Sequence, residues 1–291
     1  MRNNKGQLAP FFIIVIAILI MAIMVTANIG KVGLHRVRTA NASDSAALAG
    51  ASTMANGLSQ IMGMSTEMFY EYVVIQAVLA SCRLSYDAAW TLYWSFLAAQ
   101  YFSLKVAEKV GGDTCDSAED TAAQFAFMNS GINENKPRNP GESYDDWRKR
   151  RGDFGQWMKD KKYKDKIDNI HEYSWEESEG AINKVSVEIH RPGGYGLTPI
   201  IVPGIVCGSI MWVGCVCHAP LPFIAGIADC SNDNDPITVK VTRTEPDKDL
   251  GLWRMRYGSI SSRAVAAPYD GNVRPEPLGG REYDSKLIET E

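Results

Sequence analysis

The chain has 291 residues, enough for one large domain or two small ones beside a membrane segment. Its 45% hydrophobic and 22% charged residues are typical of a folded protein and exclude global disorder. The formal net charge of -4 lacks the basic excess of nucleic-acid-binding domains, so no nucleic-acid partner is expected.

The N-terminal segment from Gln7 to Gly30 contains no Asp, Glu, Lys or Arg. A helix of roughly 20 apolar residues, rising about 1.5 Å per residue, crosses a hydrocarbon core about 30 Å thick. We therefore predict an N-terminal tail and transmembrane helix over residues 1–30, with membrane lipid as a partner. A cleaved secretory signal is the alternative, because Arg2 and Lys5 form a positively charged start, but the apolar region of such a signal is normally shorter.

A run of small residues follows the apolar segment, from Ala42 to Ala51. Together with the Gly-Gln pair that begins at Gly6, with Gly30 and with Arg36, this run resembles the N-terminal region of TadE/TadG-like proteins of tight-adherence (Flp pilus) assembly systems. The resemblance implies a pilin-like, membrane-anchored structural component of a Flp pilus or related secretion apparatus. It also makes Gly6 a candidate processing site, although Phe11 stands where pilin precursors carry a glutamate.

The same resemblance implies a location and partners. We expect a single-pass protein of the bacterial cell membrane, with its N-terminus in the cytoplasm and its main domain periplasmic or extracellular. The expected partners are other pilus or secretion-apparatus subunits, and a homo-oligomer is one of the expected assemblies.

The small-residue run also predicts close helix packing. Alanine has the highest helix propensity and lets helices approach closely, so the transmembrane helix is expected to continue as a rigid stalk. The candidate helix-packing residues are Asp44, Ala47, Leu48 and Ala51, and Asp44 shares a face with Leu48 and Ala51 at helical spacing. A solvated charge at Asp44 and ordinary packing inside one domain are the alternatives.

Helical periodicity continues over residues 54–110, where no proline interrupts it. We predict a helical stalk and core helices over residues 31–112, ending at the pair Gly111-Gly112. Residues 88–104 contain no charged side chain and are the candidate for a second span, but they fall short of the about 18 residues that a span needs.

Residues 113–183 change to a polar composition, and Pro137 and Pro140 place a loop among them. Basic residues near Trp147 and Trp157 could form a surface for single-stranded nucleic acid or anionic lipid. The aspartates between them favour solvated helices instead. We predict a polar insertion of helices and loops.

The C-terminal part is predicted to be a disulfide-rich β region over residues 184–267, followed by a flexible tail over residues 268–291. Alternating apolar residues predict strands at 184–190, 237–242, 252–257 and 259–266. Residues 192–228 contain no charged side chain, but repeated prolines and glycines favour buried strands and turns over a lipid-facing helix. A re-entrant or membrane-apposed hairpin is the alternative.

These elements predict the α+β class. The N-terminal transmembrane helix continues into long helices and is followed by a small, mostly antiparallel sheet, a pilin-like architecture.

The six cysteines are Cys82, Cys115, Cys207, Cys215, Cys217 and Cys230. An even number in an exported domain favours disulfides, and we expect Cys82 to pair with Cys115 because both flank the end of one predicted helix. Two alternatives concern the sequence Cys215-Val216-Cys217-His218: a redox-active pair, or a zinc site with Cys207 and Cys230.

No hydrolase, phosphate-binding, metalloprotease or dinucleotide-binding motif occurs, and the histidines are scattered. The acidic loop 229–235 lacks the glycine and terminal glutamate of a calcium-binding loop. We therefore predict a protein that is not an enzyme and needs no cofactor or metal. An exported thiol-disulfide enzyme and a surface-binding membrane protein are the alternative functions.

Overall fold

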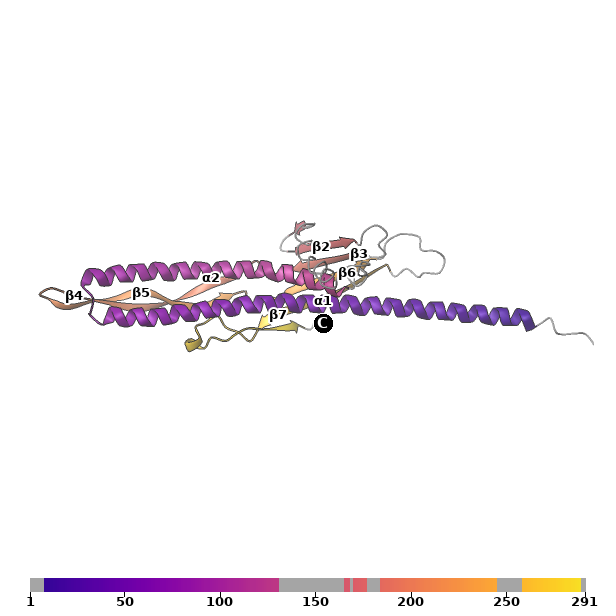
Figure 1. Ribbon diagram of the computed structural model, residues 1–291, viewed down its shortest axis with the longest axis horizontal. Helices are drawn as coiled ribbons and strands as arrows, with labels where there is room; N and C mark the ends of the chain where they lie inside the picture. Colours follow the sequence, from indigo (N-terminus) through magenta and orange to yellow (C-terminus); the bar gives the residue numbers. More distant parts are fainter. Residues whose placement is uncertain (1–7, 131–164, 168–169, 177–183, 245–257, 289–291) are drawn as a thin grey trace, which may run out of the picture.

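The structure is a computed structural model that describes residues 8–130, 165–167, 170–176, 184–244 and 258–288. Two long helices, an antiparallel sheet and a long β-hairpin lie along one axis and give an elongated molecule (Figure 1). The predicted α+β class, with a long N-terminal apolar helix followed by antiparallel strands, is confirmed.

Helix α1 runs from Leu8 to Ala80 without interruption, and its first half projects from the rest of the molecule (Figure 1). Apolar side chains cover residues 11–25 of this half on all sides, with Phe11, Ile13 and Ile23 more than half exposed. By length and composition, this helix could span a membrane. Such a surface is unfavourable in water, whereas lipid accepts it and the helix satisfies its own backbone hydrogen bonds.

Helix α2 spans Tyr86–Asn129 and returns alongside α1 (Figure 1). Ser85 caps its start by accepting a hydrogen bond from the backbone N–H of Ala88 at 3.4 Å. The predicted helix end at Gly111-Gly112 is wrong, because α2 continues to Asn129. Gly111 instead serves close packing, since a Cβ there would lie 3.2 Å from the ring of Tyr195.

A six-stranded antiparallel sheet packs against the middle of α1 and the C-terminal part of α2, in the order β1-β2-β3-β6-β7-β8. Its strands are β1 Asp165–Ile167, β2 Ile170–Glu176, β3 Lys184–His190, β6 Ile237–Thr244, β7 Ser259–Tyr269 and β8 Asp284–Ile288. The predicted strands at 184–190, 237–242 and 259–266 are thereby confirmed, whereas the one at 252–257 lies outside the described residues.

Two segments differ from their sequence-based descriptions. Strands β1 and β2 fall inside the insertion that was expected to hold helices and loops, while its basic stretches lie outside the described residues. The tail after Pro268 is not uniformly flexible: a short 3₁₀ helix at Glu276–Leu278 precedes β8, which pairs with β7, and Tyr283 is buried. Backbone pairing and an anchored aromatic side chain hold this tail in place.

Strands β4 (Gly196–Ile210) and β5 (Gly214–Ser231) form a separate two-stranded sheet, most of it from the charge-free segment 192–228. The predicted strands and turns are present, but the strands are not buried throughout: Ile201 is 65% and Ile205 43% exposed. The hairpin extends along α1 and α2 to the end of the molecule opposite the projecting half of α1, which we call the distal end (Figure 1). Because an isolated two-stranded hairpin is marginal in water, it depends on the helices for support.

Candidate functional site: the small-residue seam, the outer stripe and the cysteine clamp

Small residues line the contact between α1 and α2. We call this the small-residue seam, and it consists of Ala42, Ala46, Ala47, Gly50 and Ala51 on α1 with Ala118, Ala122, Ala123 and Ala126 on α2. Buried side chains of β6, among them Ile237 and Val239, close the seam from the sheet side. Small side chains are needed because a helix and a sheet both approach α1 here.

The predicted helix-packing residues divide between two faces. Ala47 and Ala51 are fully buried in the seam, whereas Asp44 and Leu48 are exposed. Asp44 and Ala51 are seven residues apart and therefore point in nearly the same direction on a helix. Their different burial arises because more elements surround α1 at Ala51 than at Asp44, which periodicity alone does not reveal.

Asp44 and Leu48 belong to an exposed line of side chains that we call the outer stripe. It consists of Leu34, Val37, Asn41, Asp44 and Leu48, which follow one another at alternating spacings of three and four residues. Leu34 is 50% and Val37 is 57% exposed. The stripe connects the projecting apolar half of α1 with the region that packs in the seam.

A charge cluster, buried at Glu119 and exposed at Asp116, joins α2 to the chain just after β3. The Nε of Arg191 donates to Oε2 of Glu119 at 2.9 Å, and an Nη donates to the carboxylate of Asp116. The side chain of Glu119 is only 1% exposed and that of Arg191 11%. Burial lowers the pKa of Arg191, but the hydrogen bond and charge of Glu119 outweigh it, so the pKa is raised and the guanidinium stays charged.

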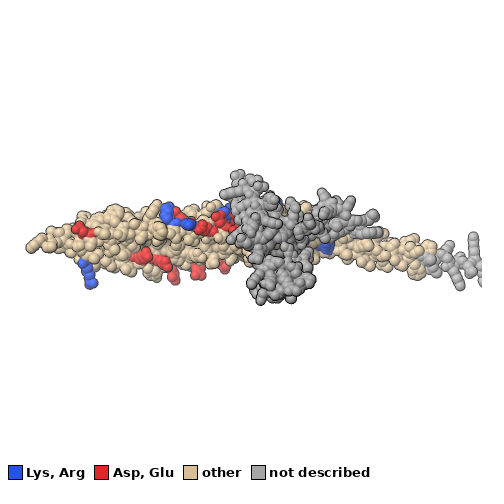
Figure 2. All heavy atoms as spheres, turned by 45° about the horizontal axis from the view of Figure 1, so that its top comes forward, with Lys and Arg blue, Asp and Glu red and all other residues tan. Residues whose placement is uncertain are grey.

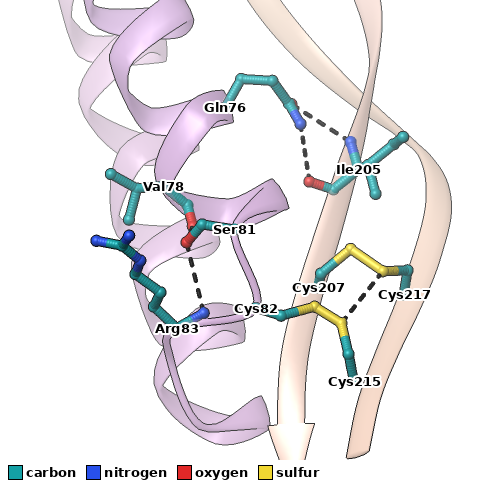
Figure 3. The surroundings of a disulfide bond; sticks show 9 residues. All are labelled: Gln76, Val78, Ser81, Cys82, Arg83, Ile205, Cys207, Cys215 and Cys217. Carbon is teal, nitrogen blue, oxygen red and sulfur yellow. Dashed lines mark hydrogen bonds between the residues drawn. A yellow bond between two sulfur atoms is a disulfide. The ribbon is translucent and has the colours of Figure 1, made fainter.

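Two glutamines hold the β4–β5 hairpin against the helices. Gln76 of α1 exchanges hydrogen bonds with the backbone of Ile205, donating to its carbonyl at 2.9 Å and accepting from its N–H at 3.3 Å (Figure 3). Gln100 of α2 makes the same exchange with Ile224 on β5 and is fully buried. Each glutamine side chain therefore donates one hydrogen bond to the hairpin backbone and accepts one from it, as a neighbouring strand would. Sequence reasoning missed both residues, although an isolated amide in an apolar, charge-free stretch was a usable signal.

Four cysteines meet at the distal end, and we call them the cysteine clamp. Disulfides join Cys82 to Cys215 and Cys207 to Cys217, tying the α1–α2 turn to the hairpin and the two hairpin strands to each other (Figure 3). The expected pairing of Cys82 with Cys115 is wrong. Because α2 continues past Gly111, Cys115 lies about 45 Å from the α1–α2 turn along the helix.

The clamp bears on both alternatives proposed for its cysteines. All four sulfur atoms lie within 4.8 Å of one another, and the sulfurs of Cys215 and Cys217 are 3.8 Å apart. The predicted zinc set is not brought together, because Cys82 takes the place expected for Cys230. With both bonds formed, no thiolate of the clamp is available for a metal, and redox exchange would first require reduction.

Cys115 and Cys230 are buried reduced thiols in a second location, beside Tyr195. Burial raises the pKa of both thiols, that of Cys230 to about 12. A thiol that stays protonated is a poor nucleophile. The two groups therefore suit a structural role better than catalysis.

Alkylation with iodoacetamide tests these thiols. At pH 8 the folded protein should accept no label, and after unfolding without reductant it should accept label at Cys115 and Cys230 alone, as intact mass would show. Since the folded pKa of Cys230 is raised, its stabilising contribution is present below about pH 8.5 and is lost as the pH rises toward about 12. Labelling of the folded protein at pH 8 would contradict the burial.

Comparison with protein families concerns the N-terminal part of this geometry. Residues 6–53 match the family model described as putative Flp pilus-assembly TadE/G-like. The N-terminal region of the chain is TadE/TadG-like. The match relates the chain to Flp pilus assembly and to that system's subunits in general. No curated protein and no solved structure matches the chain.

The TadE/TadG-like region contains the apolar half of α1, the whole outer stripe and the α1 side of the seam. Gly6, the candidate processing site, lies outside the described residues. The clamp, the glutamines and Arg191 all lie beyond the matched residues, so the match does not bear on them.

Gly50 lies within the TadE/TadG-like region and gives a sharp test of the seam. A Cβ there would lie 2.6 Å from Cδ1 of Ile237 and 3.3 Å from the carbonyl oxygen of Ala118. We expect Gly50→Ala to destabilise the fold by about 1 kcal/mol, because overpacking outweighs the gain in helix propensity.

Gly63, on the same helix, is the matched control, because a Cβ there would meet nothing within 4 Å. Gly63→Ala should stabilise by about 0.5–1 kcal/mol. Denaturant unfolding of the full chain in detergent measures both variants. Equal effects of the same sign would contradict the close approach at Gly50.

Proposed function

We propose that the protein is a membrane-anchored, pilin-like structural component of a Flp pilus or related secretion apparatus. Helix α1 anchors the chain in lipid, and the α+β domain engages other subunits outside the cytoplasm. The observation that carries this proposal is that within the TadE/TadG-like region one continuous helix, α1, joins an exposed apolar start to the small-residue seam of the folded domain. The role is structural, not enzymatic.

The cysteines support the proposed placement of the domain. Disulfides persist in oxidising compartments and are rare in the cytosol. Both bonds of the clamp lie at the distal end, far from the apolar half of α1 (Figure 1). The proposal therefore puts the N-terminus in the cytoplasm and the sheet, hairpin and clamp on the other side of the membrane.

The outer stripe supports a helical contact with another subunit or another copy of the chain. Alternating spacings of three and four residues are those of a helix-packing seam. Leu34, Val37 and Leu48 are exposed along this stripe without a partner helix in the described part of the chain. Asp44 within the stripe would fix the register of the contact, as single polar residues do in coiled coils.

Pulldown of the detergent-extracted full chain tests this function. The wild type should recover other pilus subunits, and Val37→Lys with Leu48→Lys should lose them while the fold stays intact, because both side chains are exposed. Val74→Lys is the matched control, since Val74 is 61% exposed on the same helix but outside the stripe. Recovery of no pilus subunit by the wild type would contradict the proposal.

The state of the N-terminus tests the anchor separately. Sequencing of the membrane-extracted protein should give the intact N-terminus or, if processing occurs after Gly6, a start at Gln7. Both results retain the apolar helix. A start beyond Ala27 would mean that the helix is a cleaved signal, and the anchor would be refuted.

A second function is favoured by one specific observation. The two disulfides of the clamp are 3.8 Å apart between Cys215 and Cys217, and both of these residues are exposed. An exported thiol-disulfide enzyme would show one bond that mild reductant opens readily, whereas structural bonds resist it. Intact mass after graded reduction separates the two functions.

A further inference from the structure

The turn between β4 and β5 presents apolar side chains to solvent. Met211 is 81% exposed, Trp212 97% and Val213 68%. Trp212 has a φ of 88°, in the left-handed region where a bulky residue is strained. A side chain that is almost fully exposed on a strained backbone adds nothing to the packing of the fold. A role for Trp212 must therefore lie in a contact with another molecule.

The structure holds this tip, residues 211–213, away from the rest of the molecule. The backbone N–H of Ser209 donates to the carbonyl of Leu84 at 2.8 Å, which fixes the hairpin at the level of the α1–α2 turn. The Cys82–Cys215 disulfide ties the other strand to the same turn. The tip therefore projects beyond the turn at the distal end and cannot fold back onto the helices (Figure 1).

The surroundings of the tip are nearly without charge. Residues 192–228, which include the whole turn, contain no Asp, Glu, Lys or Arg. Figure 2 shows charged side chains along the middle of the molecule and few at the distal end. Two exposed charges are the exceptions: Arg83 on the α1–α2 turn and Asp87 in the first turn of α2.

We propose that the tip inserts into the interfacial layer of a lipid bilayer. A stable protein interface needs about 800 Å² from each partner, whereas one tryptophan buries at most about 250 Å², so three side chains are too few. Lipid needs apolar side chains without matched polar groups, and tryptophan is enriched at the boundary between membrane and water. Arg83, exposed on the turn from which the tip projects, is the basic side chain available to lipid phosphates.

This bilayer is not the one that holds α1. The helix is about 110 Å long, and after a span of about 30 Å it still separates the tip from its own membrane by roughly 80 Å. The chain would then bridge two facing lipid surfaces. This last step rests on the anchor of the proposed function, while insertion of the tip does not.

Flotation of the full chain in nanodiscs with protein-free vesicles tests the proposal. The nanodisc occupies the anchor, so only the ectodomain is free to bind vesicles of phosphatidylcholine and phosphatidylglycerol. The wild type should float with the vesicles, and Trp212→Gly should reduce binding about tenfold. Glycine suits the positive φ of this position, so the variant should fold at least as well as the wild type.

Two further variants make the test specific. Ile201→Ser removes another exposed apolar side chain, 65% exposed on β4 but far from the tip, and should float normally. Arg83→Gln should weaken binding about fivefold on anionic vesicles and not on phosphatidylcholine alone.

Several outcomes would overturn the tip's role: no flotation of the wild type, equal loss in Trp212→Gly and Ile201→Ser, or nanodiscs that pair with each other instead of with vesicles. Retention of the chain in nanodiscs is scored first and reports on the anchor alone. If it fails, flotation of the detergent-free chain still compares Trp212→Gly with Ile201→Ser.

Discussion

Replacing Cys82 and Cys215 together by serine should lower the unfolding free energy of the protein by about 5 kcal/mol. The bond joins residues that are 133 apart in sequence. A disulfide that closes so long a loop lowers the conformational entropy of the unfolded chain more than one that closes a short loop. Both residues must change at once, because a single replacement would leave a thiol within 4.8 Å of the other disulfide, free to exchange. Denaturant unfolding of the full chain, followed by tryptophan fluorescence, measures the loss.

The other bond of the clamp provides the matched control. Cys207 and Cys217 are only 10 residues apart and face each other across the hairpin, so Cys207→Ser with Cys217→Ser should cost about 3 kcal/mol. The order of the two effects is the informative result. A larger loss from the short loop, or no loss from the long one, would mean that the clamp does not restrict the unfolded chain as these loop lengths require.

The secondary structure could be predicted best where one residue pattern decides it. The charge-free start of α1 and the alternating residues of β3 and β6 are such cases, because lipid and a half-covered sheet each require one pattern. No such residue pattern predicted that α2 continues past Gly111. The glycine at this position packs against the ring of Tyr195, a partner 84 residues away in sequence, and does not end the helix.

The candidate sites were likewise only partly predictable from the sequence pattern. Asp44 and Ala51 lie on one helix face in the sequence pattern, and only their different surroundings distinguish the exposed residue from the buried one. The cysteine pairing also depended on how far α2 extends. Gln76 and Gln100 were overlooked because their partners are backbone groups of the hairpin, which leave no mark in the sequence beyond the isolated amides.

Arg191→Met should destabilise the protein by about 3 kcal/mol, because it removes the guanidinium beside the buried carboxylate of Glu119. Methionine retains much of the apolar stem of arginine, so the loss reports on charge more than on packing. Denaturant unfolding of the full chain measures this loss.

Lys240→Met is the control for Arg191→Met. Lys240 contacts Glu188 at 3.0 Å, but the two side chains are 42% and 38% exposed, so the pair should contribute less than about 1 kcal/mol. The contrast depends on burial and not on distance, since the Nε–Oε2 contact of Arg191 with Glu119 is 2.9 Å. Equal losses from the two variants would imply that water reaches Glu119.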